Sequence, residues 1–351
     1  MPTPSSNFQR NSTMDKKRKS LFPLFIGLTA FAVLIYQYGE TWMRHLLLYL
    51  STAKWARKLV THTALAWRVA SRFVAGETIE DAITTTKQLN AKDMHVTLDY
   101  LGENVSRADE AIEACNHIMQ LLEKIHETGV DATVSIKLSQ IGMHIDPILM
   151  KQNAEAILQC AQKFNNRIRL DMEEGSTVDI TLDLYRSLRY HQGFENVGVV
   201  IQSYLFRSCE DVQKLIREGA SVRLCKGAYA EPAEIAFSKK EDTDSSFVQL
   251  TQLMLSEEAR QNGVHLGVAT HDEQMIQATI DYATSQQISS DDFEFQMLFG
   301  VRRDLQEELV AKGYQMRVYV PFGTAWYPYF VRRLAERPAN LWFFLSNFIR
   351  R

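Results

Sequence analysis

The chain alternates short apolar segments with segments of helical length from His95 to Val320. The short segments are rich in β-branched residues, which is typical of strands covered on both faces. They are His95–Leu101, Thr133–Leu138, Ile168–Met172, Val197–Ser203, Ser221–Cys225, Leu266–Ala269, Phe293–Leu298 and Met316–Val320. Segments of helical length lie between them, for example Pro147–Phe164, Thr177–His191 and Thr243–Asn262. Eight strand–helix units in about 250 residues predict a (β/α)8 barrel of the TIM type.

An open, doubly wound sheet is the alternative fold. Such sheets commonly carry a Gly-rich phosphate-binding turn after the first strand, and the segment that follows Leu101 has no such pattern. The net charge of −3 gives no reason to expect a nucleic-acid partner. The four cysteines are widely spaced and the nine histidines are scattered, so we expect reduced thiols and neither a metal site nor a disulfide framework.

The N-terminal region differs from the rest of the chain. A basic cluster, Lys16–Lys19, precedes the apolar segment Leu21–Tyr38, whose length is at the short end for a membrane span. A membrane anchor, a signal peptide with a small-residue site at Ala30–Ala32, and a true start at Met43 all remain open. The expected organisation is a basic and apolar segment (1–42), N-terminal helices (43–92) and the catalytic barrel (93–351). Within the second region, residues 44–74 form a basic amphipathic pattern typical of a docked helix or a membrane-surface helix.

Polar residues stand at or near the C-terminal ends of the predicted strands, where the active site of a (β/α)8 barrel lies. They are Asp99, Lys137, Asp171, Gln202, Arg223, His271, Glu294, Gln296, Arg317 and Tyr319. Buried polar groups are costly unless they are paired, so such a set predicts a functional site. The excess of positive groups, with Lys226 included, implies an anionic ligand: a carboxylate, a phosphate-bearing cofactor, or both. Redox chemistry at such a site would need a cofactor.

An arginine pair follows the last predicted strand. Trp326–Glu336 reads as a helix that begins with aromatic residues and contains Arg332 and Arg333. The guanidinium group binds a carboxylate or phosphate in a bidentate manner, so the pair predicts an anion clamp. Tyr329 and Glu336 are three or four residues from the arginines, and all four can share one helical face.

Several of these strings resemble the proline dehydrogenase family, in that family's order and over roughly residues 75–345. They are Ser135–Ser139, Asp171–Glu174, Val222–Tyr229, Ala269–His271, Glu294–Gly300, Arg317–Gly323 and Arg332–Glu336. The resemblance is to the monofunctional members and implies an FAD-dependent (β/α)8 barrel. Such an enzyme oxidises L-proline to Δ1-pyrroline-5-carboxylate, the first step of proline catabolism, and passes electrons to a membrane quinone.

The resemblance also implies roles for individual residues. It assigns catalytic roles to Asp171 and Arg223, with Asp171 pairing with Lys137. It assigns substrate binding to Lys137, Leu298, Tyr319, Tyr329, Arg332 and Arg333. It assigns cofactor binding to Met172, Gln202, Arg223, Lys226, Gly227, Ala228, Thr270, His271 and Glu336. Two positions depart from the common pattern, namely Cys225 and Asp272.

Delivery of electrons to a quinone implies association with the membrane. We expect the barrel at the cytoplasmic face, bound peripherally or anchored by residues 21–38. Three other functions stay open: a hydroxyproline dehydrogenase, a non-catalytic ligand-sensing barrel, and an aldolase-like barrel with Lys137 as a Schiff-base lysine. The bulk of Tyr319 near the substrate ring argues against the first of these.

Overall fold

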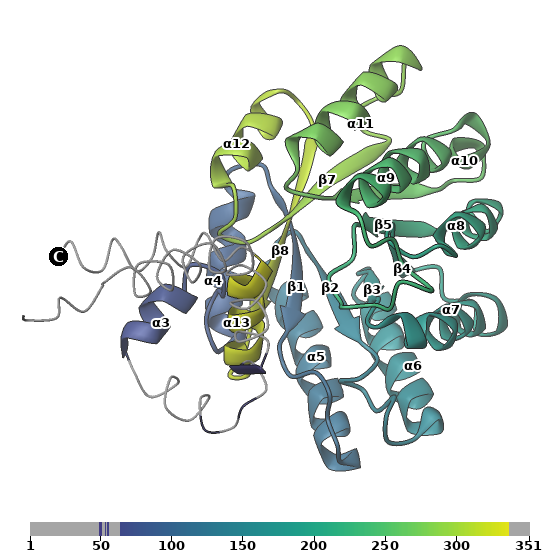
Figure 1. The fold of residues 1–351 in the computed structure, drawn as a ribbon. Coiled ribbons are helices and arrows are strands. Elements are labelled where there is room, and N and C mark those ends of the chain that lie inside the picture. The colour runs from purple at the N-terminus through teal and green to yellow at the C-terminus, as the bar shows by residue number, and fades with distance from the viewer. Residues whose placement is uncertain (1–48, 51–52, 54, 56–63, 337–351) are drawn as a thin grey trace, which may run out of the picture. The chain divides into compact units, whose positions relative to one another are not determined.

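Eight parallel strands form a closed barrel in the computed structural model, which describes residues 49–50, 53, 55 and 64–336 (Figure 1). Each strand pairs with the next, and the first pairs with the last. The strands are β1 (His95–Tyr100), β2 (Ala132–Lys137), β3 (Ile168–Asp171), β4 (Val197–Gln202), β5 (Ser221–Cys225), β6 (His265–Ala269), β7 (Phe293–Leu298) and β8 (Gln315–Phe322). The predicted (β/α)8 fold is confirmed, as are all the predicted strands to within two residues at either end.

Helices surround the barrel and connect its strands (Figure 1). They are α3 (Ala64–Ala70), α4 (Ile79–Asn90), α5 (Ala108–Thr128), α6 (Pro147–Lys163), α7 (Val178–Arg186), α8 (Ser208–Arg217), α9 (Lys240–Met254), α10 (Glu257–Gln261), α11 (Glu273–Ser285), α12 (Arg303–Ala311) and α13 (Trp326–Glu336). The predicted helix Thr243–Asn262 is two helices, because Ser256 caps α10 by accepting a hydrogen bond from the Ala259 N–H. The predicted helix Thr177–His191 is α7 followed by a π-helical turn, Ser187–His191.

The chain divides into two compact units. One comprises Ser51–Phe330 and contains the whole barrel; the other includes Val331–Glu336, the last turns of α13. The whole predicted N-terminal segment, residues 1–42, lies outside the described residues, as does about half of the basic stretch 44–74, whose described part includes α3. Among the described residues, no helix combines the length and the apolar character that crossing a membrane requires.

The two faces of the barrel strands differ in chemistry. Alternate residues of β1 to β8 are buried and apolar, and they form the core together with the helices; examples are Val96, Leu98, Ile136 and Val318. The residues between them are mostly polar and bond to one another across the barrel, as Arg223 of β5 does with Asp171 of β3. The strands therefore differ from the expectation of apolar faces on both sides. The interior of this barrel is polar, whereas apolar layers fill most barrels of this type.

Candidate active site

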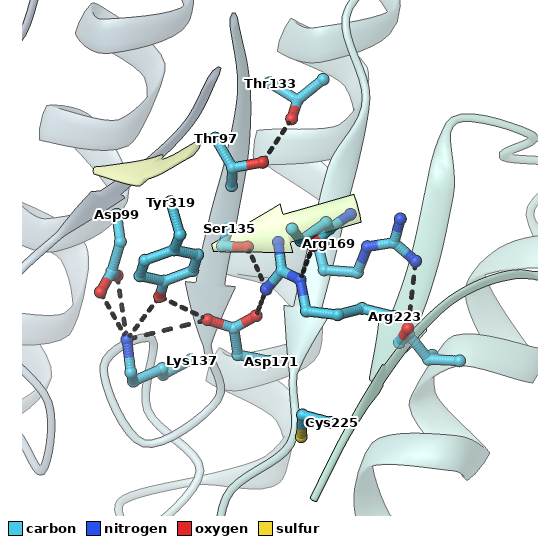
Figure 2. Close-up of polar contacts among 12 residues, drawn as sticks. Thr97, Asp99, Thr133, Ser135, Lys137, Arg169, Asp171, Arg223, Cys225 and Tyr319 are labelled. Carbon is cyan, nitrogen blue, oxygen red and sulfur yellow. Dashed lines mark hydrogen bonds and ion pairs between the residues drawn. The ribbon is translucent and has the colours of Figure 1, made fainter. Parts of the chain in front are cut away.

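Asp171, the last residue of β3, lies at the centre of a network of charged and polar side chains (Figure 2). Its Oδ2 accepts a hydrogen bond from the Tyr319 hydroxyl at 2.7 Å, and its Oδ1 pairs with Nη1 of Arg223 at 2.7 Å. Asp171 is buried, so these two partners offset the cost of removing its charge from water. Parallel strand ends at one mouth of a barrel bring together residues that are distant in sequence.

Lys137, the last residue of β2, forms the predicted ion pair with Asp171 and a shorter, unpredicted one with Asp99. Its Nζ lies 2.8 Å from Oδ2 of Asp99 but 3.9 Å from the nearest oxygen of Asp171. Asp99 is therefore its main partner, and Asp171 is a second, more distant one (Figure 2). Burial alone would lower the pKa of Lys137, but the charges of Asp99 and Asp171 outweigh it and hold that pKa above its usual value. Lys137 is thus a cation at neutral pH, with its side chain 16% exposed.

Tyr319 of β8 contacts both Asp171 and Lys137 through its hydroxyl group. Burial, together with the charges of Asp171 and Asp99, raises the pKa of its phenol well above the ordinary value, so the hydroxyl stays protonated and donates. The hydroxyl oxygen is also 3.4 Å from Nζ of Lys137. The guanidinium carbon of Arg223 lies 5.1 Å from the centroid of the Tyr319 ring, within the range of a cation–π contact.

Arg223 is also held from the side opposite Asp171. Its Nε donates to Oε1 of Gln296 at 2.5 Å, and Nε2 of Gln296 donates to Oε1 of Glu294 at 2.5 Å. Glu294 in turn pairs with Nε of Arg317 at 2.7 Å. Gly267 on the neighbouring strand β6 gives Gln296 its space, because a Cβ there would lie 2.3 Å from Nε2 of Gln296. The network therefore continues from the C-terminal mouth of the barrel into its interior.

Glu294 is charged within this network. Burial would raise the pKa of its carboxyl, but the Arg317 guanidinium outweighs burial and lowers that pKa to about 2. Ser135 of β2 adds a further contact, because its hydroxyl accepts a hydrogen bond from Arg223 at 3.2 Å. The arginine that the resemblance places beside the flavin is thus fixed by three different strands.

Gln202, a predicted cofactor-binding residue, is buried with one polar atom unused. Its Nε2 donates to the carbonyl of Glu173 at 3.1 Å. Its Oε1 has no hydrogen-bond partner among the described residues, although the side chain is 3% exposed. An orphan acceptor of this kind is costly, which is the signature of a group that meets a ligand donor.

Gly227 and Lys226 follow β5 in the same region. Gly227 has φ of +112°, and a Cβ there would lie 2.4 Å from the ring of Tyr204, so only glycine fits. Lys226 contacts Asp244 and lies 2.7 Å from Asp272, so carboxylates already surround its charge. The hydrogen bonding of Asp272, which departs from the family pattern, is also defined: its other oxygen caps α11 by accepting from the Gln274 N–H.

The remaining predicted cofactor residues of the barrel lie at the ends of β3, β5 and β6. His271 Nε2 accepts a hydrogen bond from the Leu298 N–H at 2.9 Å, which fixes the ring beside the end of β7. Thr270 and Met172 are buried, whereas Ala228 is exposed. Their contact with a cofactor stays a prediction. At the other unusual position, burial raises the pKa of the Cys225 thiol to about 11, so it stays protonated.

The predicted clamp residues fall in two units. Tyr329 is buried and belongs to the barrel unit. Arg332 and Arg333 belong to α13 and to the other unit, and the side chain of Glu336 lies outside the described residues. Their roles at the substrate therefore stay predictions.

Sequence reasoning gave no role to several residues that the structure brings into the site. Asp99, Glu294, Gln296 and Arg317 were recognised only as polar residues of the strands. A second acid after β3, Glu173, accepts hydrogen bonds from the backbone and the hydroxyl of Ser139. The available signal was the period-2 alternation, which places polar residues of each strand on one face.

Comparisons with known proteins identify the family. A model of the family described as proline dehydrogenase matches residues 82–345. Proline dehydrogenase 1 of Bacillus subtilis subsp. natto is 40% identical over 310 residues, which are 88% of this chain and 100% of that protein. The proline dehydrogenase of Deinococcus radiodurans is 40% identical over 287 residues, which are 81% of this chain and 91% of its own.

A solved structure supports the same conclusion. The crystal structure of proline utilization A from Bdellovibrio bacteriovorus, inactivated by N-propargylglycine, matches 77% of this chain with a TM-score of 0.72 and 26% identity. This chain spans 32% of that longer protein. The polar barrel mouth, the family model and the two relatives agree, and the chain belongs to the proline dehydrogenase family.

Proposed function

We propose that this enzyme is an FAD-dependent dehydrogenase that oxidises L-proline to Δ1-pyrroline-5-carboxylate and passes the electrons to a membrane quinone. The observation that carries the proposal is the partly buried network of Lys137, Asp99, Asp171, Tyr319 and Arg223 at the C-terminal mouth of the barrel. In this network Lys137 is a fixed cation that can bind a carboxylate, and Arg223 is a second fixed cation that can face an electron-accepting cofactor.

The residues at this mouth fit a flavin. The orphan Oε1 of Gln202 can accept a hydrogen bond from the N–H of the isoalloxazine ring. Gly227 lets the cofactor approach the backbone, and Arg223 supplies a positive charge that stabilises developing negative charge. Met172, Lys226, Ala228, Thr270, His271 and Glu336 complete the proposed cofactor site. When bound, the flavin supplies an acceptor for the hydride that leaves the proline ring.

The substrate is held through its carboxylate and its ring. Arg332, Arg333 and Lys137 bind the carboxylate, and Tyr319, Tyr329 and Leu298 enclose the pyrrolidine ring. Asp171 keeps Arg223 and Tyr319 in place by accepting from both. These residues act mainly by orientation, because positioning two reactants in one site contributes several kcal/mol to lowering the barrier, about 7–11 at most.

A visible spectrum of the purified full chain, taken before and after anaerobic L-proline, tests cofactor and reaction together. We expect an oxidised flavin spectrum that bleaches with proline and remains unchanged with hydroxyproline. N-propargylglycine, the compound that inactivated the Bdellovibrio relative, should also abolish the activity of this enzyme. A protein that stays colourless after addition of FAD would contradict the cofactor assignment, and bleaching only by hydroxyproline would contradict the substrate.

The quinone acceptor implies a location at the cytoplasmic face of the membrane, with the chain bound peripherally or anchored by residues 21–38. Membrane fractionation combined with protease protection tests this location. We expect the barrel in the membrane fraction of cells and inaccessible to protease added from outside. Cleavage of the barrel by external protease would place it on the other face.

A further inference from the structure

A second polar cavity lies at the opposite, N-terminal end of the barrel. Its volume is about 460 Å³, and it is lined by the first residues of β2 to β6, with inner residues of β7 and β8. The charged and polar residues that face it include Arg169, His265, Asn196, Glu294 and Arg317. All of them belong to the barrel unit. The catalytic network described above does not use Arg169, His265 or Asn196 of this cavity.

Arg169 of β3 is a cation with neutral partners only. Its Nη1 donates to the carbonyls of Ser221 at 2.6 Å and Val199 at 3.1 Å, and its Nη2 donates to the hydroxyl of Ser221 at 3.1 Å. Within the part of the chain that the structure describes, no carboxylate lies within ion-pair distance of its guanidinium group. A Cβ on Gly198 would lie 2.7 Å from Nη1, so the glycine makes room for the guanidinium.

The charge of Arg169 is costly where it lies. Burial, followed by the nearby charge of Arg223, lowers the pKa of its guanidinium to about 9, and the group is still charged at neutral pH. Arg169 is half-buried, and Glu294 and Asp171 stabilise its charge only from a distance, without forming an ion pair with it. Three hydrogen bonds to neutral acceptors hold the guanidinium in place, but they do not neutralise it.

Two further polar atoms in the cavity wall lack partners. Nδ1 of His265 and Oδ1 of Asn196 are buried and form no hydrogen bond with any described residue. Asn196 is oriented by its Nδ2, which donates to the carbonyls of Leu158 and Asn166. Burial lowers the pKa of His265, so its ring is neutral and can carry its single proton on Nδ1, as a donor. A buried donor of this kind lacks only an acceptor.

The acids of the cavity are engaged elsewhere or lie at its rim. Glu294 is bound to Arg317 at 2.7 Å. Asp131 pairs with His95 and Glu195 is exposed to solvent. The inner wall therefore combines a cation that has no direct ion pair among the described residues with an unused donor.

We propose that this cavity binds one small oxyanion, a free carboxylate or inorganic phosphate, through the guanidinium of Arg169 and Nδ1–H of His265. A guanidinium fork and an imidazole N–H match the oxygens of either anion. The bound anion supplies a direct counter-ion, which none of the described carboxylates provides to Arg169. We expect anion binding to raise the stability of the folded barrel.

The test is a titration of the purified full-length flavoprotein with sodium phosphate and, separately, sodium acetate, each against sodium chloride at equal ionic strength. Thermal unfolding and isothermal calorimetry are the readouts. We expect a saturable rise in Tm of several degrees and one site per chain for at least one of the two anions. Saturation by acetate alone identifies a carboxylate site, and saturation by phosphate identifies a phosphate site. Equal effects of all three salts would overturn the proposal.

Variants locate the site. Arg169→Gln and His265→Leu should each lose the saturable shift, whereas Arg260→Gln, an exposed arginine on α10, should keep it. Arg169 bonds to two strands, so its variant can fail to fold; His265→Leu removes the donor without those backbone contacts and then decides alone. A shift that persists in His265→Leu and in any folded Arg169 variant would place the anion elsewhere and overturn the proposal.

Discussion

Asp99 is 1% exposed, and both of its carboxylate oxygens lie within hydrogen-bond distance of the Lys137 ammonium. The sequence places an acid at this strand end but gives no sign of which cation it meets. The resemblance pointed to Asp171, on the next strand over. The choice depends on the direction in which a flexible four-carbon side chain turns at the end of β2, and residue spacing does not encode that direction.

Replacing Asp99 by Asn should make Lys137 easier to deprotonate. The pKa of Lys137 is raised by Asp99 and Asp171, so removing one of these charges lowers it, by about 1–3 units for a close pair. We expect an alkaline limb of the kcat/KM profile that comes from Lys137 to begin at lower pH in Asp99→Asn than in the wild type, where Lys137 stays charged through the usual alkaline range. Asp109→Asn, at an exposed acid on α5, is the matched control. An unchanged alkaline limb in Asp99→Asn would mean that Asp171 alone sets the charge of Lys137.

Arg332→Ala tests the proposed carboxylate clamp. Loss of a charged hydrogen-bonding partner costs about 1.5–3 kcal/mol, so the Michaelis constant for proline should rise by roughly ten- to a hundredfold. Steady-state kinetics with proline measure this, and the flavin spectrum of the variant serves as the folding control. A variant with unchanged proline affinity would show that Arg332 does not bind the carboxylate.

At the scale of elements, every strand of the barrel was recognisable from its β-branched, apolar character, and only the ends shifted. The break between α9 and α10 was not foreseen, although Ser256 is a good N-cap residue. Residue spacing also did not reveal that the barrel interior is polar, because each short strand shows only two or three inward residues. Their common orientation becomes visible when the strands are aligned by register.

The ion pair between Glu294 of β7 and Arg317 of β8 should make the stability of the protein depend on pH. The pKa of Glu294 is lowered from 4.5 to about 2, so the contribution of the pair is complete above 4.5 and is lost as pH falls toward 2. Glu294→Gln leaves Arg317 without its partner and should lower the free energy of unfolding by about 3–5 kcal/mol at pH 7. Denaturant unfolding at several pH values measures the difference between the two proteins.

That difference should shrink as the pH falls below 4.5 in the range where both proteins stay folded. Glu127→Gln, at an exposed acid on α5, should show little change at any pH. If the free energies of unfolding of the wild type and Glu294→Gln differed by the same amount at every pH, the assignment of an ionised carboxylate to Glu294 would be contradicted.

At the scale of the whole molecule, the barrel is closed by the pairing of β1 with β8, strands far apart in the sequence. A chain that ends at Gly313 lacks β8 and leaves β1 and β7 as open edges, which are templates for pairing with other chains. We expect this truncated chain to form aggregates in size-exclusion chromatography. Insertion of Gly-Ser after Lys312 keeps β8 and should give the same elution profile as the full chain, because longer surface turns cost little. A soluble truncated protein with native flavin content would contradict closure as a requirement for folding.

The polar lining of the barrel also bears on how the chain behaves while it is being synthesised. A nascent half-barrel of β1 to β4 would turn Thr97, Asp99, Ser135, Lys137 and Arg169 toward water, and their hydration needs no partner strand. Its apolar side chains would already be covered by the helices of the same units. A half-formed barrel with an apolar interior exposes a hydrophobic concave face, and such surfaces make folding intermediates prone to aggregation. For this enzyme the exposed strand edges, and not the concave face, are the surface that must be protected until β8 leaves the ribosome.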